Sequence, residues 1–116
     1  MDVRRKFGNR GEDLAASYLE KKGLKILARQ YTTRLGEIDL VCREGEEIVF
    51  VEVKTRATKT FGYPEESVTQ KKLEKIARVG EQYLQEYFLE ACPFRVDVVA
   101  IETDSKEPVI THFRHV

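Results

Sequence analysis

The sequence predicts an α/β sandwich with the element order α-β-β-β-α-β and a short last strand. Apolar residues recur at helical spacing in two segments, 10–22 and about 67–88, and they alternate with polar residues in the segments between and after these two. The second helix separates two strands, which predicts that those strands run parallel through a right-handed crossover. The predicted sheet is therefore mixed.

The first helix is predicted over residues 10–22, with Asn9 as its N-cap and Gly23 at its end. Its apolar face consists of Leu14, Ala15, Tyr18 and Leu19. Residues 24–31 form the first predicted strand, although Leu27 interrupts the alternation of that segment.

Residues 36–43 and 47–56 both alternate, and they flank a tight turn around Gly45, so we expect an antiparallel hairpin. On its first strand, one face carries Ile38, Leu40 and Cys42 and the other carries Glu37, Asp39 and Val41. On its second strand, one face carries Val49, Val51, Val53 and Thr55 and the other carries Ile48, Phe50, Glu52 and Lys54.

A loop is expected at residues 58–64, before the second helix at about 67–88. The apolar stripe of this helix, which needs a sheet to cover, consists of Leu73, Ile76, Ala77, Gly80, Tyr83, Leu84 and Tyr87. Residues 94–101 supply the strand expected to run parallel to 47–56, and residues 109–113 supply a short edge strand.

The composition favours one folded domain over residues 1–116. Hydrophobic residues make up 41% and charged residues 34%, a balance that excludes collagen-like and low-complexity chains. The longest apolar runs, 48–51 and 98–101, are far shorter than the roughly 20 residues that span a bilayer, and no secretory signal is recognisable. We therefore expect a cytoplasmic protein that does not act at a membrane. Cys42 and Cys92 lie at no metal-ligand spacing and are expected to be buried, reduced thiols.

Charge is balanced over the whole chain but unevenly distributed along it. There are 20 basic and 20 acidic residues, so net charge does not indicate a polyanionic partner. Residues 54–80, however, contain seven basic and three acidic side chains, whereas residues 81–107 contain two basic and seven acidic ones. The middle of the chain can therefore present a positive face.

Ionised groups are costly inside an apolar strand, yet the hairpin carries Asp39, Glu52 and Lys54. Glu52 and Lys54 share a face about 7 Å apart, and Asp39 on the neighbouring strand can oppose them. Two carboxylates beside an ammonium group can hold Mg²⁺ and a water molecule. The lysine, Lys54, can orient or deprotonate that water and offset negative charge in a phosphoryl transition state. The structural alternative is a salt bridge of Lys54 with Asp39 or Glu52 on a solvated sheet face.

These residues carry a family resemblance. The segment GEIDLVCREGEEIVFVEVKTR at 36–56, followed by FGYPEESVTQKK at 61–72 and FRVDVVAI at 94–101, resembles the YraN-like family of small bacterial proteins, within the PD-(D/E)XK nuclease superfamily. The resemblance covers about residues 8–101. It implies a restriction-endonuclease-like αβββαβ core, with a mixed central sheet flanked by helices. It also implies a metal-dependent nuclease most similar to archaeal Holliday-junction resolvases.

The resemblance assigns roles residue by residue. Asp39 matches the metal-binding aspartate, Glu52 the second acid, Lys54 the catalytic lysine and Glu12 the acid of the first helix, an auxiliary metal ligand. The backbone carbonyl between the last two motif residues, that of Val53, is implied as a further ligand. Ile38 rather than proline precedes Asp39, which leaves the number of metal ions open.

Several of these residues have simpler explanations. Asn9 followed by Glu12 fits a capping box, in which the carboxylate returns to the start of the helix. Lys72 matches a basic position of the family's second helix and Gln70 lies near it, but both also fit a solvated helix face.

Arg56 is expected to contact phosphate rather than to act in the chemistry. Together with Gln70 and Lys72 it forms the predicted nucleic-acid-binding set. His112 and His115 are expected to be surface residues without a metal.

The leading hypothesis is a Mg²⁺- or Mn²⁺-dependent DNA endonuclease that selects DNA structure, such as a branch or junction, rather than sequence. A DNA-binding or scaffold module with the nuclease fold and little cleavage is the alternative, and a ribonuclease or another phosphoryl-transfer enzyme is a third. The sequence does not fix the oligomeric state, but a homodimer would suit junction resolution, which requires two symmetrical cuts.

Overall fold

The computed structural model describes residues 10–56, 69–104 and 106–116 of the chain. In this part of the chain two helices and five strands follow one another. They are α2 (Arg10–Lys21), β1 (Lys25–Thr33), β2 (Gly36–Glu44), β3 (Glu47–Arg56), α3 (Gln70–Glu86), β4 (Phe94–Glu102) and β5 (Val109–Phe113). The predicted element order and α/β class are confirmed, and apart from the start of α3 the ends of the elements lie within two residues of the predicted ones.

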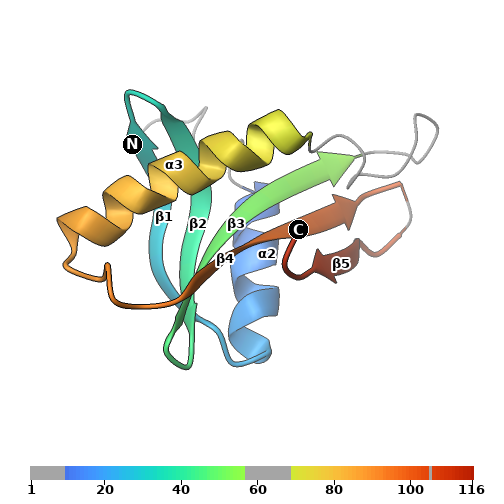
Figure 1. Ribbon diagram of the computed structural model, residues 1–116. Helices are drawn as coiled ribbons and strands as arrows, with labels where there is room; N and C mark the ends of the chain where they lie inside the picture. The colour runs from blue at the N-terminus through green and yellow to red at the C-terminus, as the bar shows by residue number, and fades with distance from the viewer. Residues whose placement is uncertain (1–9, 57–68, 105) are drawn as a thin grey trace, which may run out of the picture.

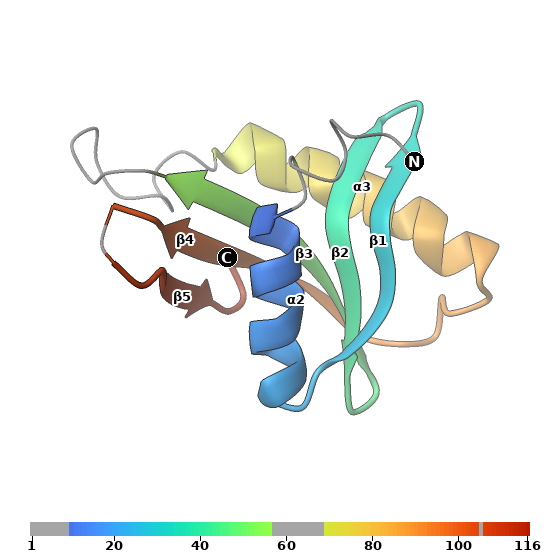
Figure 2. The same ribbon diagram turned by 180° about the vertical axis from the view of Figure 1, so that it is seen from behind.

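The five strands form one mixed sheet in the order β1-β2-β3-β4-β5. β3 and β4 are parallel, in a register that runs from Ile48 opposite Phe94 to Arg56 opposite Glu102, and the other three neighbouring pairs are antiparallel. The parallel pair was predicted from the helix between the two strands, and it is confirmed. α3 crosses one face of the sheet (Figure 1) and α2 covers the other (Figure 2).

Each helix buries its own apolar layer against the sheet. The layer under α2 contains Ala15 and Leu19 of the helix with Leu40, Val49 and other sheet residues, and the layer under α3 is centred on Phe50. Alternation on β3 produces this division, because Val49 and Val51 point to α2 whereas Ile48 and Phe50 point to α3. The polar residues that continue these two faces determine where a site can form.

The predicted face of β2 is wrong at one residue. Leu40 and Cys42 pack under α2 as expected, but Ile38 packs in the layer under α3. Ile38 still pairs with Tyr31 of β1, but β2 pairs with β3 only from Leu40 to Glu44, and Gln30, which precedes Tyr31 on β1, adopts φ +50°. The regular alternation therefore breaks between Leu40 and Ile38. An irregularity of register between Ile26 and Ala28 of β1 likewise explains why Leu27 interrupted the alternation there.

Local signals set the described helix ends. Gly23 adopts φ +98° after α2, and the Leu24 amide bonds the carbonyl of Leu19. α3 begins after Thr69, whose hydroxyl accepts a hydrogen bond from the Lys72 amide at 3.2 Å. The expected N-cap Asn9, the loop at 58–64 and the predicted start of the second helix near residue 67 lie outside the described residues.

The stripe predicted for the second helix is largely confirmed, with Ile76, Gly80, Tyr83 and Leu84 buried. Val79 is buried as well, whereas Tyr87 is half exposed because the helix has ended. Neither of the two described helices is long and apolar enough to cross a membrane.

Candidate functional site

An open pocket of about 260 Å³ is lined by the start of β2, by Glu52 of β3 and by the first turns of α3. Its polar lining comes from three elements, with Glu37 and Asp39 on β2, Glu52 on β3, and Lys72 and Lys75 on α3. The sequence places Glu52 here because it continues the face of Ile48 and Phe50 toward α3. The structure therefore brings Asp39, Glu52 and Lys72, three predicted site residues, to one pocket.

Asp39 stands at the point where the ladder between β2 and β3 stops. Its Oδ2 accepts a hydrogen bond from the backbone amide of Val53 at 2.8 Å. Burial raises the pKa of Asp39 to about 7; the Val53 hydrogen bond lowers it, while the charge of Glu52 and, more weakly, of Glu12 raises it further. A carboxylate with this pKa is poorly solvated as an anion, so a cation beside it would be stabilising.

Glu52 is a buried acid, only 8% exposed, with two ammonium groups beside it. Its Oε1 lies 2.9 Å from Nζ of Lys72 and 3.7 Å from Nζ of Lys54. The predicted salt-bridge alternative for Lys54 thus has a counterpart in the structure, but the closer partner of Glu52 is Lys72. Sequence reasoning assigned Lys72 to nucleic-acid binding and missed this ion pair, which depends on how closely α3 approaches β3.

The two lysines differ in how firmly they hold their protons. Contact with the Lys72 ammonium group and burial lower the pKa of Lys54. Burial also lowers the pKa of Lys72, but its contacts with Lys54 and Glu52 outweigh burial and raise it. Of the two lysines, Lys72 therefore holds its proton more tightly.

Glu12, in the first turn of α2, is buried at 8% exposure. Its Oε2 accepts a hydrogen bond from Nε2 of Gln30 at 2.9 Å, and its Oε1 has no hydrogen-bond partner among the described residues. Burial raises the pKa of Glu12, against the opposing effects of Gln30 and Arg29. Gln30 adopts φ +50°, an uncommon conformation that sequence reasoning had no means to predict.

These acids suit a small divalent cation with few protein ligands. Within residues 10–56, 69–104 and 106–116, no three His, Cys, Asp or Glu side chains converge closely enough to hold one metal ion. Mg²⁺ commonly takes one or two carboxylates and keeps several waters, so Asp39 and Glu52 are a sufficient pair of side chains. The assignment of Glu12 and of the Val53 carbonyl as further ligands stays a prediction.

The other two predicted nucleic-acid-binding residues, Arg56 and Gln70, are not among the described residues that line the pocket. Arg56 ends β3, and its carbonyl accepts hydrogen bonds from the amide and hydroxyl of Thr103. Gln70 is the exposed first residue of α3. Of Arg56, Gln70 and Lys72, only Lys72 is among the described residues that line this pocket.

Comparison with known proteins places this arrangement in a family. A family model described as "Uncharacterised protein family UPF0102" matches residues 11–101. The chain belongs to this family. The match includes Glu12, Asp39, Glu52, Lys54 and Lys72.

Individual UPF0102 proteins are similar to the chain over most of their length. The one from Caldicellulosiruptor saccharolyticus is 42% identical over 107 residues, which cover 92% of this chain and 91% of that protein. The one from Carboxydothermus hydrogenoformans is 42% identical over 113 residues, with 97% and 96% covered. The one from Moorella thermoacetica is 46% identical over 107 residues, with 92% and 89% covered.

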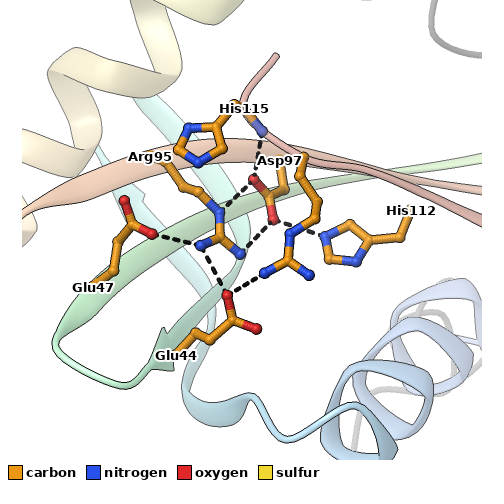
Figure 3. A network of polar contacts seen from close by, with 7 residues as sticks. Glu44, Glu47, Arg95, Asp97, His112 and His115 are labelled. Atoms are coloured by element: carbon orange, nitrogen blue, oxygen red, sulfur yellow. Dashed lines mark hydrogen bonds and ion pairs between the residues drawn. The ribbon is translucent and has the colours of Figure 1, made fainter.

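This UPF0102 chain also contains a second polar cluster, on the opposite face of the sheet (Figure 3). Arg95 and Asp97 lie side by side on β4, and Nε of Arg95 donates to Oδ1 of Asp97 at 2.9 Å. Nη1 of Arg95 reaches Glu47 at 2.5 Å and Glu44 at 3.0 Å. Burial raises the pKa of Asp97, but hydrogen bonds from His112 and Arg95 outweigh it and lower the pKa to about 2.

The expectation that His112 is a surface residue is wrong. Its side chain is 1% exposed, and its Nε2 lies 2.7 Å from Oδ2 of Asp97. β5 pairs with β4 and brings this ring against the buried carboxylate, a tertiary contact that spacing along the chain does not indicate. His115 is exposed as expected, although its amide donates to Asp97 at 3.0 Å. Cys42 is buried and Cys92 half-buried, and both thiols are free.

Proposed function

We propose that this UPF0102 protein is a Mg²⁺- or Mn²⁺-dependent endonuclease that hydrolyses DNA phosphodiester bonds. One observation carries the proposal: Asp39 and Glu52 line the same pocket, and Glu52 contacts the ammonium groups of Lys54 and Lys72. The sequence pattern around these residues resembles that of PD-(D/E)XK nucleases. The mixed sheet with a helix on each face agrees with the restriction-endonuclease-like core that this resemblance implies.

In this proposal Asp39 and Glu52 hold the cation, which when bound supplies Lewis-acid activation of the phosphodiester and of water. Asp39 is oriented for this role by the amide of Val53. A cation held by Glu52 would compete with Lys72, whose Nζ lies 2.9 Å from the Glu52 carboxylate. Both carboxylates are held on β-strands, which limits their movement.

Lys54 is assigned to the reacting phosphate. Its side chain is 27% exposed and stands next to Glu52, so its ammonium group can reach both the pocket and an approaching polyanion. A fixed cation at this position offsets the negative charge that accumulates on the phosphate oxygens in the transition state. Lys72, the more firmly protonated lysine, holds Glu52 in place and adds positive charge to the pocket.

A DNA-binding or scaffold module is the second candidate. It is favoured by the ion pair between Lys72 and Glu52, which neutralises one proposed metal ligand, and by the absence of three converging acids among the described residues. Against it stands Asp39, a half-buried acid whose negative charge would weaken the binding of a polyanion and serves no purpose in a module that only binds DNA.

A cleavage assay with the purified protein tests the proposal. Linear duplex, single-stranded, flap and four-way-junction DNA would be incubated with Mg²⁺ or Mn²⁺, and with EDTA as a control. We expect metal-dependent cleavage of at least one form, lost in Asp39→Asn and Glu52→Gln, and calorimetric Mn²⁺ binding that is lost in the same variants. Unchanged Mn²⁺ binding in both variants would refute the assignment of the ligands.

A further inference from the structure

A second cleft adjoins the Asp39 pocket and extends along α3. It has a volume of about 330 Å³ and is lined by Leu35, Lys71, Glu74, Lys75 and Arg78. We call it the Leu35 cleft. Lys75 lines both cavities, so the cleft continues the pocket of Asp39 and Glu52 toward the turn between β1 and β2.

The Leu35 cleft has positive walls. Lys71, Lys75 and Arg78 occupy positions i, i+4 and i+7 of α3, so they share one side of the helix, and all three are exposed. Within the described part of the chain none of the three makes an ion pair, and Glu74 is the one acid that lines the cleft. These unneutralised cations extend the positive charge of Lys72 away from the Asp39 pocket.

The far wall of the cleft is an exposed leucine in a fixed position. Leu35 is 44% exposed, at the turn that joins β1 to β2. Its amide bonds the hydroxyl of Thr33 at 3.1 Å, which orders the turn. At Gly36 an added Cβ would meet Cε of Lys75 at 2.9 Å, so the turn packs directly on the stem of that lysine. Leu35 is thus held beside the cations rather than on a free hairpin.

We propose that the Leu35 cleft binds the nucleic-acid strand that flanks the reacting phosphate, with the three cations on phosphate oxygens and Leu35 against the face of an unstacked base. The proposal rests on the proposed function, because it takes the Asp39 pocket as the position of the reacting phosphate. From Lys71 to Arg78 the helix rises about 10 Å, longer than the axial rise of about 3.4 Å per nucleotide of a stacked strand, so the three cations can reach more than one phosphate.

This geometry selects a class of substrate. In continuous duplex DNA every base is stacked and offers no face to an apolar side chain, whereas at a branch, flap or single-stranded segment an unpaired base does. Phosphate contacts alone would bind all these forms similarly. Leu35 therefore gives the cleft a preference for DNA with unpaired or partly unstacked bases. An acidic polypeptide would satisfy the cations but would leave Leu35 without a partner.

Binding measurements without divalent cations test the proposal apart from cleavage. Fluorescence anisotropy would compare labelled single-stranded, forked and duplex DNA of equal length at several salt concentrations. For the parent we expect at least fivefold tighter binding to the forked and single-stranded forms. Leu35→Ala should remove this preference, and the double variant Lys75→Ala/Arg78→Ala should weaken binding to every form and flatten the salt dependence by between one and two units of slope.

A matched control removes two lysines elsewhere. Lys21 and Lys25 are exposed and lie outside the Leu35 cleft, so Lys21→Ala/Lys25→Ala loses the same charge as the cleft double variant. We expect this control to bind DNA within twofold of the parent. Circular dichroism melts of all variants would show that the folded state is kept, which the exposure of these side chains favours.

The outcomes separate the two proposals. If the parent cleaves DNA but Leu35→Ala keeps the preference, or the control loses as much affinity as the cleft variant, the role of the cleft is wrong and the nuclease proposal stands. If poly-glutamate displaces forked DNA at equal charge concentration, the cleft binds acidic polypeptide instead. If the parent neither binds nor cleaves any DNA form, both proposals fail.

Discussion

The carboxylate of Asp39 accepts a hydrogen bond from the backbone amide of Val53 at 2.8 Å. This contact lies just beyond Leu40 and Val51, the last pair of the ladder between β2 and β3. A side chain thus takes the place of a backbone acceptor where the two strands diverge. Asp39 also lines the pocket, so the hydrogen bond holds an acidic group at its wall. The cost is a carboxylate in a poorly hydrated position among other acids.

Asp39→Asn is therefore expected to stabilise the metal-free protein at neutral and alkaline pH. The pKa of Asp39 is raised to about 7, against roughly 3.9 in the unfolded chain, so the folded state binds the proton more tightly. The stability of the parent then falls as pH rises from about 4 through 7, and asparagine, which still accepts the Val53 amide, avoids this loss. We expect a gain of about 1 to 3 kcal/mol at pH 8 that nearly disappears at pH 4.

Urea unfolding in EDTA at the two pH values measures this gain. Asp104→Asn removes an exposed carboxylate and is the matched control, expected within 0.5 kcal/mol of the parent, roughly the range of surface substitutions, at both pH values. A variant no more stable than the parent at pH 8 would show that Asp39 is adequately solvated. The argument for a cation at this carboxylate would then lose its main support.

The second polar cluster is expected to make the protein less stable as pH falls, whereas Asp39 makes it less stable as pH rises. Asp97 has a pKa lowered to about 2 by His112 and Arg95, so its contribution to stability is present above about pH 4 and is lost as pH falls toward 2. Asp97→Asn removes the fully buried counter-charge of the buried Arg95 and should cost about 3 to 5 kcal/mol at pH 7. Its stability should also change less between pH 4 and pH 2 than that of the parent.

Asp13→Asn supplies the comparison for this cluster. It breaks the exposed ion pair between Asp13 and Arg29, whose side chains are 61% and 42% exposed, and should cost less than about 1 kcal/mol. Equal costs for the two substitutions in urea unfolding would mean that the Arg95 cluster is as well solvated as a surface pair.

Local pattern was sufficient for the elements of this chain, because burial on two faces imposes period two on β3 and a helical period on α3. It was also sufficient to bring Asp39 near Glu52, since a tight hairpin fixes which strand residues are neighbours. It failed at Ile38, where β2 no longer pairs with β3, and at His112, whose burial depends on β5 reaching Asp97. Contacts of this kind join segments far apart in sequence.

The same limit applies within the candidate site. Glu52, Lys54 and Lys72 were each predicted to have a role, but the ion pair between Glu52 and Lys72 depends on the distance between a helix and a strand. Gln30 was not predicted at all, because nothing in its neighbourhood on β1 marks it as the partner of Glu12. Motifs identify the participants of a site, whereas tertiary packing determines how they pair.

Gly80 provides a prediction about the core under α3. A Cβ at this position would meet Cε2 of Phe50 at 2.4 Å, and the Phe50 ring is fully buried against Tyr83 and Phe94. Gly80→Ala should therefore lower the free energy of unfolding by about 1 to 3 kcal/mol, even though alanine favours helices by about 1 kcal/mol. Gln82→Ala, on the exposed side of the same helix, should have almost no effect.

A double variant identifies the cause of the Gly80 effect. Phe50→Leu alone should destabilise the core, but Gly80→Ala in that background should cost less than in the parent, because the ring that clashes is gone. Additive costs in chemical denaturation would contradict the predicted clash, since substitutions that do not touch one another add.

The last prediction separates the two lysines beside Glu52. Lys72 lies 2.9 Å and Lys54 3.7 Å from the same carboxylate oxygen, yet the proposed function gives them different roles. Lys54→Met keeps most of the stem and removes the charge that offsets negative charge on the phosphate. This variant should still bind Mn²⁺ and DNA but lose single-turnover cleavage by on the order of a hundredfold or more.

Lys72→Met should instead bind Mn²⁺ at least as tightly as the parent, because no ammonium group competes at Glu52. Its DNA binding should weaken, and the salt dependence of that binding should flatten by about one unit of slope. Calorimetry, anisotropy and cleavage at saturating DNA separate these effects. If Lys54→Met cleaves at the parental rate, Lys54 is only an ion-pair partner and the nuclease mechanism is wrong. If the parent itself cleaves none of the four DNA forms, the binding module becomes the better explanation of the pocket.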